Sequence, residues 1–341
     1  MRIIEVVAER NYRVVVGANA LDEIKAITAS HRRVLLVAPS NLIKLFKIKE
    51  SRNLSIIGTP VGENQKNVKV LESIWRKCSA VGLERSDAII GFGGGATTDL
   101  TGFAAATWLR GIEWYAIPTS LAGMVDAAIG GKTGINAQKG KNLIGTFYSP
   151  SGVFIDINYL SKLSNRDLSA GLAEVIKCGF ISDYKILNLV QDDVLNFEQL
   201  ISRAVKVKAK VVAKDFKESK IREVLNYGHT LGHAIEKDSN YKLRHGEAIS
   251  IGMVYAAELS RELLGLADEV VELHRVLLGN HKLPTSYPRS RWSSLVQLLL
   301  KDKKVKQGKV RFIGISKIGK PVWLEDVPSS TLAKVYERIT L

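Results

Sequence analysis

The chain has 341 residues, enough for two domains, and its 46% hydrophobic and 24% charged residues are typical of a soluble globular protein. No apolar run approaches the roughly 18 residues that span a bilayer, and the first residues lack the apolar core of a signal peptide. Cys78 and Cys178 lie far apart and suggest reduced thiols. We therefore expect a cytoplasmic protein that binds no membrane.

The net charge of +15 makes nucleic-acid binding a hypothesis to weigh. The basic residues are widely spread, however, and no stretch interleaves them with stacking aromatic residues. The densest run, residues 206–220, is explained mostly by the solvated face of a helix. We expect no nucleic-acid partner, and we expect the remaining cations to serve a multiply anionic small molecule.

Strands and helices alternate in the first half of the chain. The N-terminal residues alternate like a strand, residues 32–39 and 112–120 predict further strands, and residues 67–83 predict a helix that ends at Gly82. Residues 86–111 predict a buried strand, a glycine turn and an apolar helix. This alternation implies a parallel sheet covered by helices.

The glycine turn is the first candidate binding element. Gly93, Gly94 and Gly95 follow a strand and precede a helix, where glycines let the backbone approach a phosphate and the helix start offers free N–H donors. The spacing is not that of the plain dinucleotide fingerprint, and a purely structural turn is an equal alternative. Asp99 is either a ligand of a ribose or nicotinamide amide, or an acid favoured by the helix dipole.

Residues 118–150 are too rich in glycine to form one regular element. They carry Asp126, Lys132, Lys141 and Asn142, and cations on glycine-flanked loops suit a phosphate ester. A mobile surface loop is the alternative, although such a loop would not normally carry so many Ile, Leu, Met and Phe residues.

From about residue 165 the periodicity is helical almost throughout, and residues 309–325 predict a late hairpin. The change in pattern near Tyr159 predicts two domains, residues 1–158 and 159–341. The sequence contains no internal repeat and no low-complexity linker.

The later half carries the candidate metal ligands. Glu174 and Lys177 lie three apart in an apolar helix, and a buried carboxylate there needs a partner, for which a metal is one option and an ordinary helical ion pair another. A helix beginning near Glu223 would place Asn226, His229 and His233 on one face.

His245 follows that predicted helix after a short break. Two imidazoles and a carboxylate from elsewhere could hold a divalent metal, and polar residues on a half-buried face are the alternative. The spacing lacks the glutamate of a zinc-protease motif, so the metal would serve other chemistry.

Seven motifs in order carry a resemblance: GGGATTDLTGF, TWLRG, MVDAAIGGKTGIN, GKNLIG, GLAEVIK, REVLNYGHTLGHAIE and HGEAISIGM. From roughly Gly58 to its end the chain resembles the 3-dehydroquinate synthase family of the sugar phosphate cyclase superfamily. The resemblance implies an α/β fold, with an N-terminal Rossmann-like parallel-sheet domain that binds NAD. A mainly α-helical domain that binds metal and substrate follows, and the active site lies between the two domains.

The implied activity is that of a lyase of the shikimate pathway, which leads to chorismate and the aromatic amino acids. It converts 3-deoxy-D-arabino-heptulosonate 7-phosphate into 3-dehydroquinate and phosphate. The implied route is transient oxidation by NAD, phosphate elimination, reduction and an intramolecular aldol reaction. The implied cofactors are NAD and one divalent metal, zinc or cobalt, and the implied assembly is a cytoplasmic homodimer.

The resemblance also implies roles for individual residues. The metal ligands are Glu174, His229 and His245. The catalytic residues are His233 as a proton-transfer partner, Lys132, Lys177 and Asn226. The substrate-binding residues are Arg110 from the neighbouring subunit, Asn142, Lys208, Arg222 and Lys303, the last favoured over Lys304. The NAD-binding residues are Asn41, Glu63, Lys66, Gly94, Gly95, Asp99, Thr119, Ser120, Asp126, Lys132 and Lys141.

One departure from the family concerns the adenosine end of the NAD site. The family often has an acidic residue just after the first core strand, where this chain has Ala38-Pro39-Ser40-Asn41, so Asn41 takes that place. Two alternative functions remain open. One is another sugar phosphate cyclase such as 2-deoxy-scyllo-inosose synthase, whose substrate lacks the carboxylate that Arg222 suits. The other is a metal-dependent polyol dehydrogenase.

Overall fold

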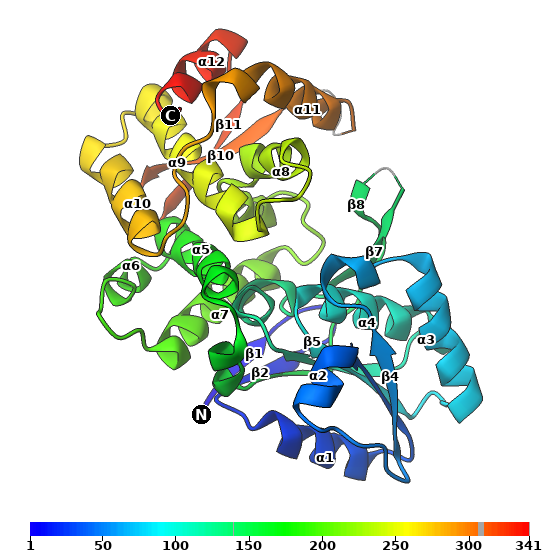
Figure 1. The fold of residues 1–341 in the computed structure, drawn as a ribbon. Helices are drawn as coiled ribbons and strands as arrows, with labels where there is room; N and C mark the ends of the chain where they lie inside the picture. Colours follow the sequence, from blue (N-terminus) through cyan, green and yellow to red (C-terminus); the bar gives the residue numbers. More distant parts are fainter. Residues whose placement is uncertain (139, 306–309, 341) are drawn as a thin grey trace. The chain divides into compact units, whose positions relative to one another are not determined.

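A computed structural model describes residues 1–138, 140–305 and 310–340, with the side chains of residues 301–305 left out (Figure 1). The chain forms two compact units. The first comprises Met1–Leu163 and Phe197–Lys217, and the second comprises Ser164–Asn196 and Glu218–Leu341. Neither unit is one continuous stretch of sequence.

The core of the first unit is a seven-stranded sheet in the order β1-β2-β9-β6-β5-β3-β4. Its strands are β1 Arg2–Val6, β2 Tyr12–Val16, β3 Val34–Pro39, β4 Leu54–Thr59, β5 Ala88–Gly93, β6 Glu113–Pro118 and β9 Gly152–Ile155. All neighbouring pairs are parallel except β1 and β2. Every residue of β3 and β5 is buried, as expected for apolar strands covered on both faces. The predicted parallel sheet is confirmed.

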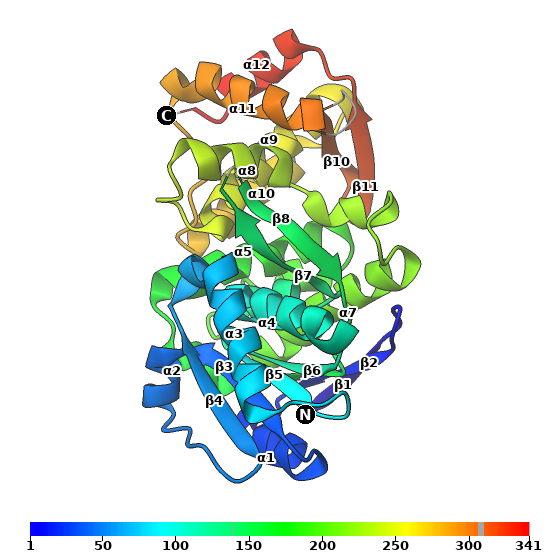
Figure 2. The same cartoon turned by 90° about the vertical axis from the view of Figure 1, so that its right-hand side faces the viewer.

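Helices cover this sheet, and α4 packs against β5 and β6 (Figure 2). The α-helices of the first unit are α1 Ala20–Ser30, α2 Ser40–Leu45, α3 Val68–Val81, α4 Gly95–Thr107 and α7 Phe197–Lys214. Its short helical turns are η1 Gly62–Gln65, η2 Trp108–Arg110, η3 Gly123–Ala127 and η4 Ile157–Lys162. An antiparallel hairpin, β7 Lys132–Ala137 and β8 Gly140–Phe147, completes the unit.

Helix α7 comes late in the sequence but packs on β1, β2 and η3 of the first unit. The sequence predicted a single boundary between residues 158 and 159, so the observed grouping differs at this helix. Lys206, Lys210 and Lys214 are exposed on α7, as predicted for a solvated face, whereas Lys208 is buried. The periodic pattern identified the helix but not the unit on which its apolar face packs.

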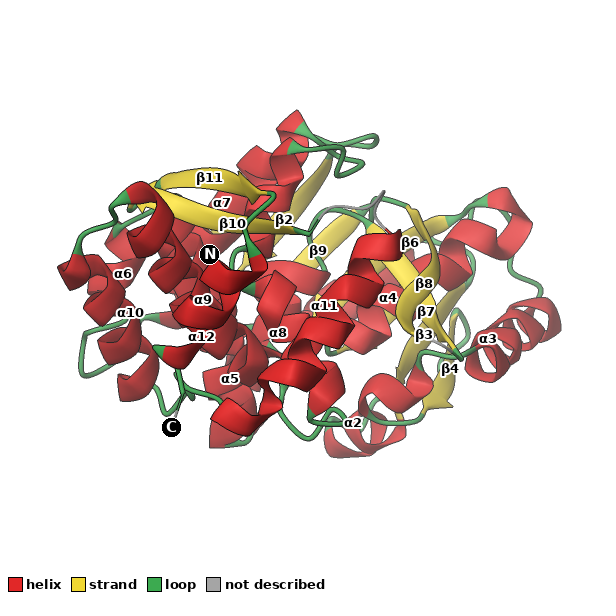
Figure 3. Cartoon of the chain, turned by 90° about the horizontal axis from the view of Figure 1, so that it is seen from above, coloured by secondary structure: helices red, strands yellow, loops and turns green. Residues whose placement is uncertain are grey.

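The second unit is mainly helical (Figure 3). Its elements are α5 Asn165–Ile181, α6 Lys185–Leu189, η5 Ile221–Asn226, α8 His229–Asp238, α9 His245–Leu264, α10 Asp268–Asn280, η6 Arg289–Arg291, α11 Trp292–Val305, β10 Arg311–Lys317, β11 Lys320–Glu325 and α12 Ser329–Glu337. Helix α9 is buried from Gly246 to Ser260 and packs against α5, α8, α10, α12 and β10, which makes it the core of this unit. The predicted late hairpin is confirmed by β10 and β11.

The predicted single helix from Glu223 is wrong. Residues Ile221–Asn226 form a 3₁₀ turn, and α8 begins only at His229. Between them Gly228 adopts φ of 80°, a left-handed conformation that ends the turn and that glycine adopts without strain. Asn226 therefore does not share a helix face with His229 and His233.

Among the residues that the structure describes, no helix is both long and apolar enough to cross a membrane.

Candidate functional site

The second unit holds a buried carboxylate–ammonium pair on α5. Glu174 is 1% exposed and Lys177 is 2% exposed, and the Lys177 ammonium donates a hydrogen bond to Glu174 Oε2. Burial opposes ionisation of Glu174, but the Lys177 ammonium and the nearby imidazoles outweigh burial and hold its pKa well below the ordinary value. Glu174 is therefore an ionised carboxylate in the protein interior.

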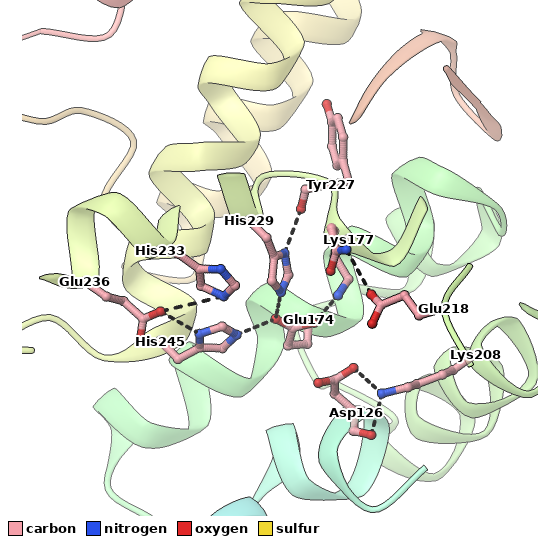
Figure 4. A network of polar contacts seen from close by, with 11 residues as sticks. Asp126, Glu174, Lys177, Lys208, Glu218, Tyr227, His229, His233, Glu236 and His245 are labelled. Atoms are coloured by element: carbon pink, nitrogen blue, oxygen red, sulfur yellow. Dashed lines mark hydrogen bonds and ion pairs between the residues drawn. The ribbon is translucent and has the colours of Figure 1, made fainter. Parts of the chain in front are cut away.

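Two imidazoles converge on this carboxylate (Figure 4). His229 Nε2 lies 3.6 Å and His245 Nε2 lies 3.1 Å from Glu174 Oε1. One potential ligand atom from each of these three residues lies within 4.8 Å of the others. Two histidines and one glutamate are a donor set of catalytic zinc sites, so the residues present fit a divalent metal.

Close helix packing brings the three residues together. A Cβ on Gly246 would lie 1.8 Å from the Ala170 carbonyl oxygen of α5, and a Cβ on Gly252 would lie 1.9 Å from the Gly228 carbonyl oxygen. Only glycine permits these approaches, which seat α9 directly on α5 and on the start of α8. The glycines of HGEAISIGM thus bring the helix that carries His245 close to the helices that carry the other two residues.

The second nitrogen of each imidazole has a partner of its own. His229 Nδ1 lies 3.2 Å from the Tyr227 carbonyl oxygen, and His245 Nδ1 lies 3.3 Å from Glu236 Oε2. Burial and the Lys177 ammonium lower the pKa of His229 well below its ordinary value. Burial acts in the same direction on His245, but hydrogen bonds to Glu174 and Glu236 outweigh it and raise the pKa of His245 to about 10.

His233 lies one turn beyond His229 on α8, and its side chain is 54% exposed. Its Nε2 is 3.9 Å from Glu236 Oε2, and its ring centroid is 5.2 Å from that of His229. The imidazole therefore stands beside the buried cluster and is accessible to solvent.

The turn η5 carries Arg222 and Asn226 just before α8. Arg222 is 1% exposed, and Asn226 Nδ2 donates a hydrogen bond to Glu218 Oε1 at 3.1 Å. A guanidinium at such depth presents a fixed planar set of donors, which suits a carboxylate or phosphate group.

The first unit contains a separate polar network around Lys66. Lys66 is 3% exposed, and its ammonium lies 2.5 Å from Asp99 Oδ2 and also donates to Asn142 Oδ1. Asn136 joins the network by donating to Glu63 Oε1 at 2.7 Å and accepting from the Asn142 N–H at 2.9 Å. Four predicted site residues are thereby brought together through Asn136, which the sequence did not single out.

The glycine turn packs on the segment that follows β6. A Cβ on Gly95 would lie 2.8 Å from Ala127 Cβ, and a Cβ on Gly94 would lie 3.2 Å from Ser120 Oγ, while the Thr119 N–H donates to the Gly93 carbonyl oxygen. This packing explains why glycines stand here, and the turn leads from a buried strand into the N-terminus of α4, which is the position that suits a dinucleotide phosphate. The residues present therefore fit NAD.

Lys208 of α7 is joined to Asp126 within the first unit (Figure 4). Its ammonium donates to the Asp126 carbonyl oxygen at 2.6 Å and to the Asp126 carboxylate. Lys208 was predicted in the second domain, and α7 instead carries it in the first unit next to a residue predicted to bind NAD.

Two family models cover most of the chain. Residues 56–170 match the model described as 3-dehydroquinate synthase N-terminal, and residues 171–305 match the model described as 3-dehydroquinate synthase C-terminal. The 3-dehydroquinate synthase of Paenarthrobacter aurescens is 44% identical to the chain, over 96% of this chain and 95% of that protein. The chain belongs to the 3-dehydroquinate synthase family.

A second relative agrees with this assignment, and solved structures of related enzymes share the fold. The 3-dehydroquinate synthase of Streptomyces avermitilis is 43% identical over 96% of this chain and 94% of that protein. The structure of the 2-epi-5-epi-valiolone synthase ValA from Streptomyces hygroscopicus, with NAD⁺ and Zn²⁺ bound, has a TM-score of 0.86 at 25% identity, covering 99% of both chains. 2-Deoxy-scyllo-inosose synthase, complexed with carbaglucose-6-phosphate, NAD⁺ and Co²⁺, has a TM-score of 0.83 at 24% identity and 99% coverage of both chains, which shows the shared fold.

Several predicted residues are not gathered into these networks by any contact described above. Asn41 is exposed on α2, Arg110 is exposed at the end of η2 with φ of 66°, and Lys132 is exposed at the start of β7. Lys141 is half-buried on β8, and the side chain of Lys303 on α11 lies outside the part of the chain that the structure describes.

The site also includes residues that the sequence did not single out. Glu236 contacts His245, and Glu218 accepts from Asn226. Glu236 follows His233 by three positions, so helical spacing alone could have indicated a shared face. Glu218 precedes the turn η5, and no periodic pattern pointed to it.

Proposed function

We propose that this family member is a working 3-dehydroquinate synthase, which converts 3-deoxy-D-arabino-heptulosonate 7-phosphate into 3-dehydroquinate and phosphate. The observation that carries the proposal is identity of 44% to a curated enzyme of that name over nearly the full length of both chains. The convergence of a glutamate and two histidines on one point of the second unit supports it.

Glu174, His229 and His245 would hold one divalent ion, zinc or cobalt, through Glu174 Oε1 and the two Nε2 atoms. When bound, this ion supplies Lewis-acid chemistry that polarises a substrate oxygen. Lys177 keeps the Glu174 carboxylate ionised in the protein interior, which is the state a metal ligand requires.

NAD would bind at the start of α4, where Gly94 and Gly95 admit its phosphates to the helix N–H groups. When bound, NAD supplies reversible hydride transfer. Lys66 orients the Asp99 carboxylate and Asn142 through direct hydrogen bonds, so that these groups are fixed before the cofactor arrives. The remaining proposed NAD contacts are Asn41, Glu63, Thr119, Ser120, Asp126, Lys132 and Lys141.

The substrate carries a carboxylate and a phosphate, which need fixed cations. We assign the carboxylate to Arg222, whose guanidinium can donate two parallel hydrogen bonds, and the phosphate to lysines, which act as point charges. Asn226 orients a substrate hydroxyl, and the exposed imidazole of His233 moves a proton. The other proposed substrate contacts are Arg110, Lys132, Asn142, Lys177, Lys208 and Lys303.

The proposed assembly is a cytoplasmic homodimer in which Arg110 enters the site of the neighbouring subunit. Two observations support this role for Arg110. Its side chain is exposed, and it lies in a turn in which Leu109, Arg110 and Gly111 all have positive φ. Non-glycine residues avoid this conformation unless the surroundings impose it.

The decisive experiment measures phosphate release from the heptulosonate phosphate, with and without a chelator, at catalytic amounts of NAD. We expect release that stops after metal removal and returns on adding Zn²⁺ or Co²⁺. Phosphate release from glucose 6-phosphate instead would indicate an inosose synthase. Net accumulation of NADH would indicate a dehydrogenase, because a cyclase restores its cofactor in every turnover.

A further inference from the structure

In each proposed metal-binding imidazole, the hydrogen-bonding partner of Nδ1 decides which of the two ring nitrogens is available to a metal. The carbonyl oxygen of Tyr227 can only accept a hydrogen bond, so His229 Nδ1, 3.2 Å away, carries the hydrogen. Ionised carboxylates also only accept, so in the metal-free protein His245 donates from Nδ1 to Glu236 Oε2 at 3.3 Å and from Nε2 to Glu174 Oε1 at 3.1 Å. In both rings Nε2 is the nitrogen that faces Glu174 Oε1. When a metal takes the place of the Nε2 hydrogen of His245, the ring keeps its other hydrogen on Nδ1, bonded to Glu236.

We propose that Glu236 is the positioning residue of His245, which fixes the tautomer and the orientation of this imidazole for metal binding. The proposal rests on the metal site of the proposed function. Partners of this kind raise the basicity of a ligating histidine and hold its ring in place before the metal binds.

His245 needs such an anchor more than His229 does. It is the first residue of α9, it follows a connection in which Asn240 and Tyr241 both have positive φ, and its side chain is 39% exposed. His229 is buried and is held by the backbone of its own turn. The only anchor of His245 besides Glu174 that the structure describes comes from the neighbouring helix α8.

Glu236 is well placed to provide this anchor. It lies two turns beyond His229 on α8 and is 7% exposed, and its own carbonyl oxygen accepts the Tyr241 N–H at 2.8 Å. A carboxylate at this depth keeps a hydrogen-bonding partner because burial without one is costly. Its backbone and its side chain therefore both hold the segment that leads into His245.

Two other roles for Glu236 are separable by experiment. His233, Glu236 and His245 also form a group whose ligand atoms lie within 4.8 Å of one another, so Glu236 could itself be a ligand. In that group Glu236 faces His245 Nδ1 and His233 is exposed. In the group with Glu174 two residues are buried, His245 is half-buried, and its Nε2 faces the carboxylate. Alternatively, Glu236 could serve only as an ionic partner of His233, 3.9 Å away.

The experiment compares Glu236→Gln and Glu236→Ala with the parent protein. Glutamine keeps the size of the side chain and an accepting oxygen but loses the charge, so it makes a weaker hydrogen bond, and alanine makes none. After the metal is stripped, the Zn²⁺ dissociation constant is measured by competition with a chromophoric chelator. We expect it to rise about 10-fold in Glu236→Gln and nearer 100-fold in Glu236→Ala.

The spectrum of bound Co²⁺, one control variant and one ligand variant complete the experiment. The visible absorption of bound Co²⁺ reports ligand geometry, and we expect its bands to shift in both Glu236 variants. Glu262→Gln is the control, since it also removes a carboxylate charge of the second unit that pairs with two basic residues, Lys334 and Arg338, and we expect no change in Zn²⁺ affinity. Glu174→Gln removes a proposed ligand and should weaken Zn²⁺ binding more than either Glu236 variant.

Each outcome has a distinct meaning. Zn²⁺ affinity and a Co²⁺ spectrum in Glu236→Gln equal to those of the parent and of Glu262→Gln would overturn the positioning role. Loss of all binding in Glu236→Gln with binding kept in Glu174→Gln would make Glu236 a ligand and also overturn it. A parent that binds no Zn²⁺ would refute the proposed metal site itself. Circular dichroism of the metal-free proteins verifies that each variant is folded. If Glu236→Ala does not fold, the comparison of Glu236→Gln with the parent decides the question.

Discussion

Arg222 combines a full positive charge with nearly complete burial, because only 1% of the residue is exposed. We expect Arg222→Lys to raise the KM for the heptulosonate phosphate by about 10- to 100-fold, because a bidentate charged hydrogen bond becomes a single point contact. The NAD dissociation constant, measured by fluorescence titration, should stay within about twofold of the parent value. An equal loss of affinity for both ligands would count against a specific role in substrate binding.

His274 is a buried histidine outside the metal cluster. Its ring stacks on Phe180 with centroids 3.4 Å apart, its Nε2 lies 2.9 Å from Tyr227 Oη, and its Nδ1 lies 2.7 Å from the Val270 carbonyl oxygen. Burial lowers its pKa to about 3, and the Arg275 charge adds to this effect. The folded protein therefore keeps this ring neutral at pH values where the unfolded chain protonates it.

The sign of the resulting pH dependence follows from this difference. Below about pH 6.5 the unfolded state takes up a proton that the folded state excludes, so stability falls as the pH falls toward 3, by up to about 1.4 kcal/mol per pH unit. Urea unfolding of the metal-free protein at several pH values between 7.5 and 5 measures this slope. His274→Gln should flatten it, and identical slopes in parent and variant would refute the assignment to His274.

At the residue scale the sequence predicted the cluster of Glu174, His229 and His245 through its resemblance to a family. Helical spacing alone favoured pairing His229 with His233, because residues four apart are neighbours on a helix. It did not find Glu236 because the contact with His245 depends on how the chain turns between α8 and α9. Such non-local contacts have no periodic signal in sequence.

At the scale of elements, α9 packs very closely on the residue that precedes α8. We expect Gly252→Ala to destabilise the protein by about 2–3 kcal/mol, because the added Cβ would lie 1.9 Å from the Gly228 carbonyl oxygen and force the helices apart. Zn²⁺ affinity should fall as well, since His229 and His245 begin these two helices. Urea unfolding and chelator competition measure the two effects.

Gly279→Ala is the matched control for this prediction. Gly279 lies in α10, and an added Cβ there would meet no atom within 4 Å. Alanine should leave stability unchanged or raise it by roughly 0.5–1 kcal/mol, because it has the better helix propensity. A similar loss of stability in both variants would show that close helix approach is not the cause.

Most elements could be predicted from the sequence, because β3 and β5 are uninterrupted apolar runs and α3 ends at Gly82 with φ of 65°. The single helix predicted from Glu223 failed at Gly228. The pattern continues through that residue, but a side chain there would lie 2.7 Å from Met253 Cγ of α9, and the chain passes in a left-handed conformation instead. Tertiary packing decided this boundary, and local propensity did not.

At the scale of the whole molecule, the proposed exchange of Arg110 between subunits gives a complementation test. Arg110→Ala and His229→Ala should each abolish most activity when alone. In a mixed dimer one site regains both residues, so unfolding and refolding an equal mixture should produce about one intact site in four. Phosphate release measures the recovery, and a mixture no more active than its components would exclude the exchange.

The place of α7 has a consequence for how the protein is made. The chain enters the second unit at Ser164, returns to the first at Phe197 and leaves it again after Lys217. The sheet of the first unit therefore lacks the helix that packs on β1 and β2 until residues beyond 214 have emerged from the ribosome, by which time α5 has already been synthesised. A fragment truncated at Leu163 would lack α7 and leave those strands uncovered, and a fragment beginning at Ser164 would carry α7 without the sheet on which it packs. We therefore expect that a cut at this single point yields no fragment that can be fused to another protein as an independent module.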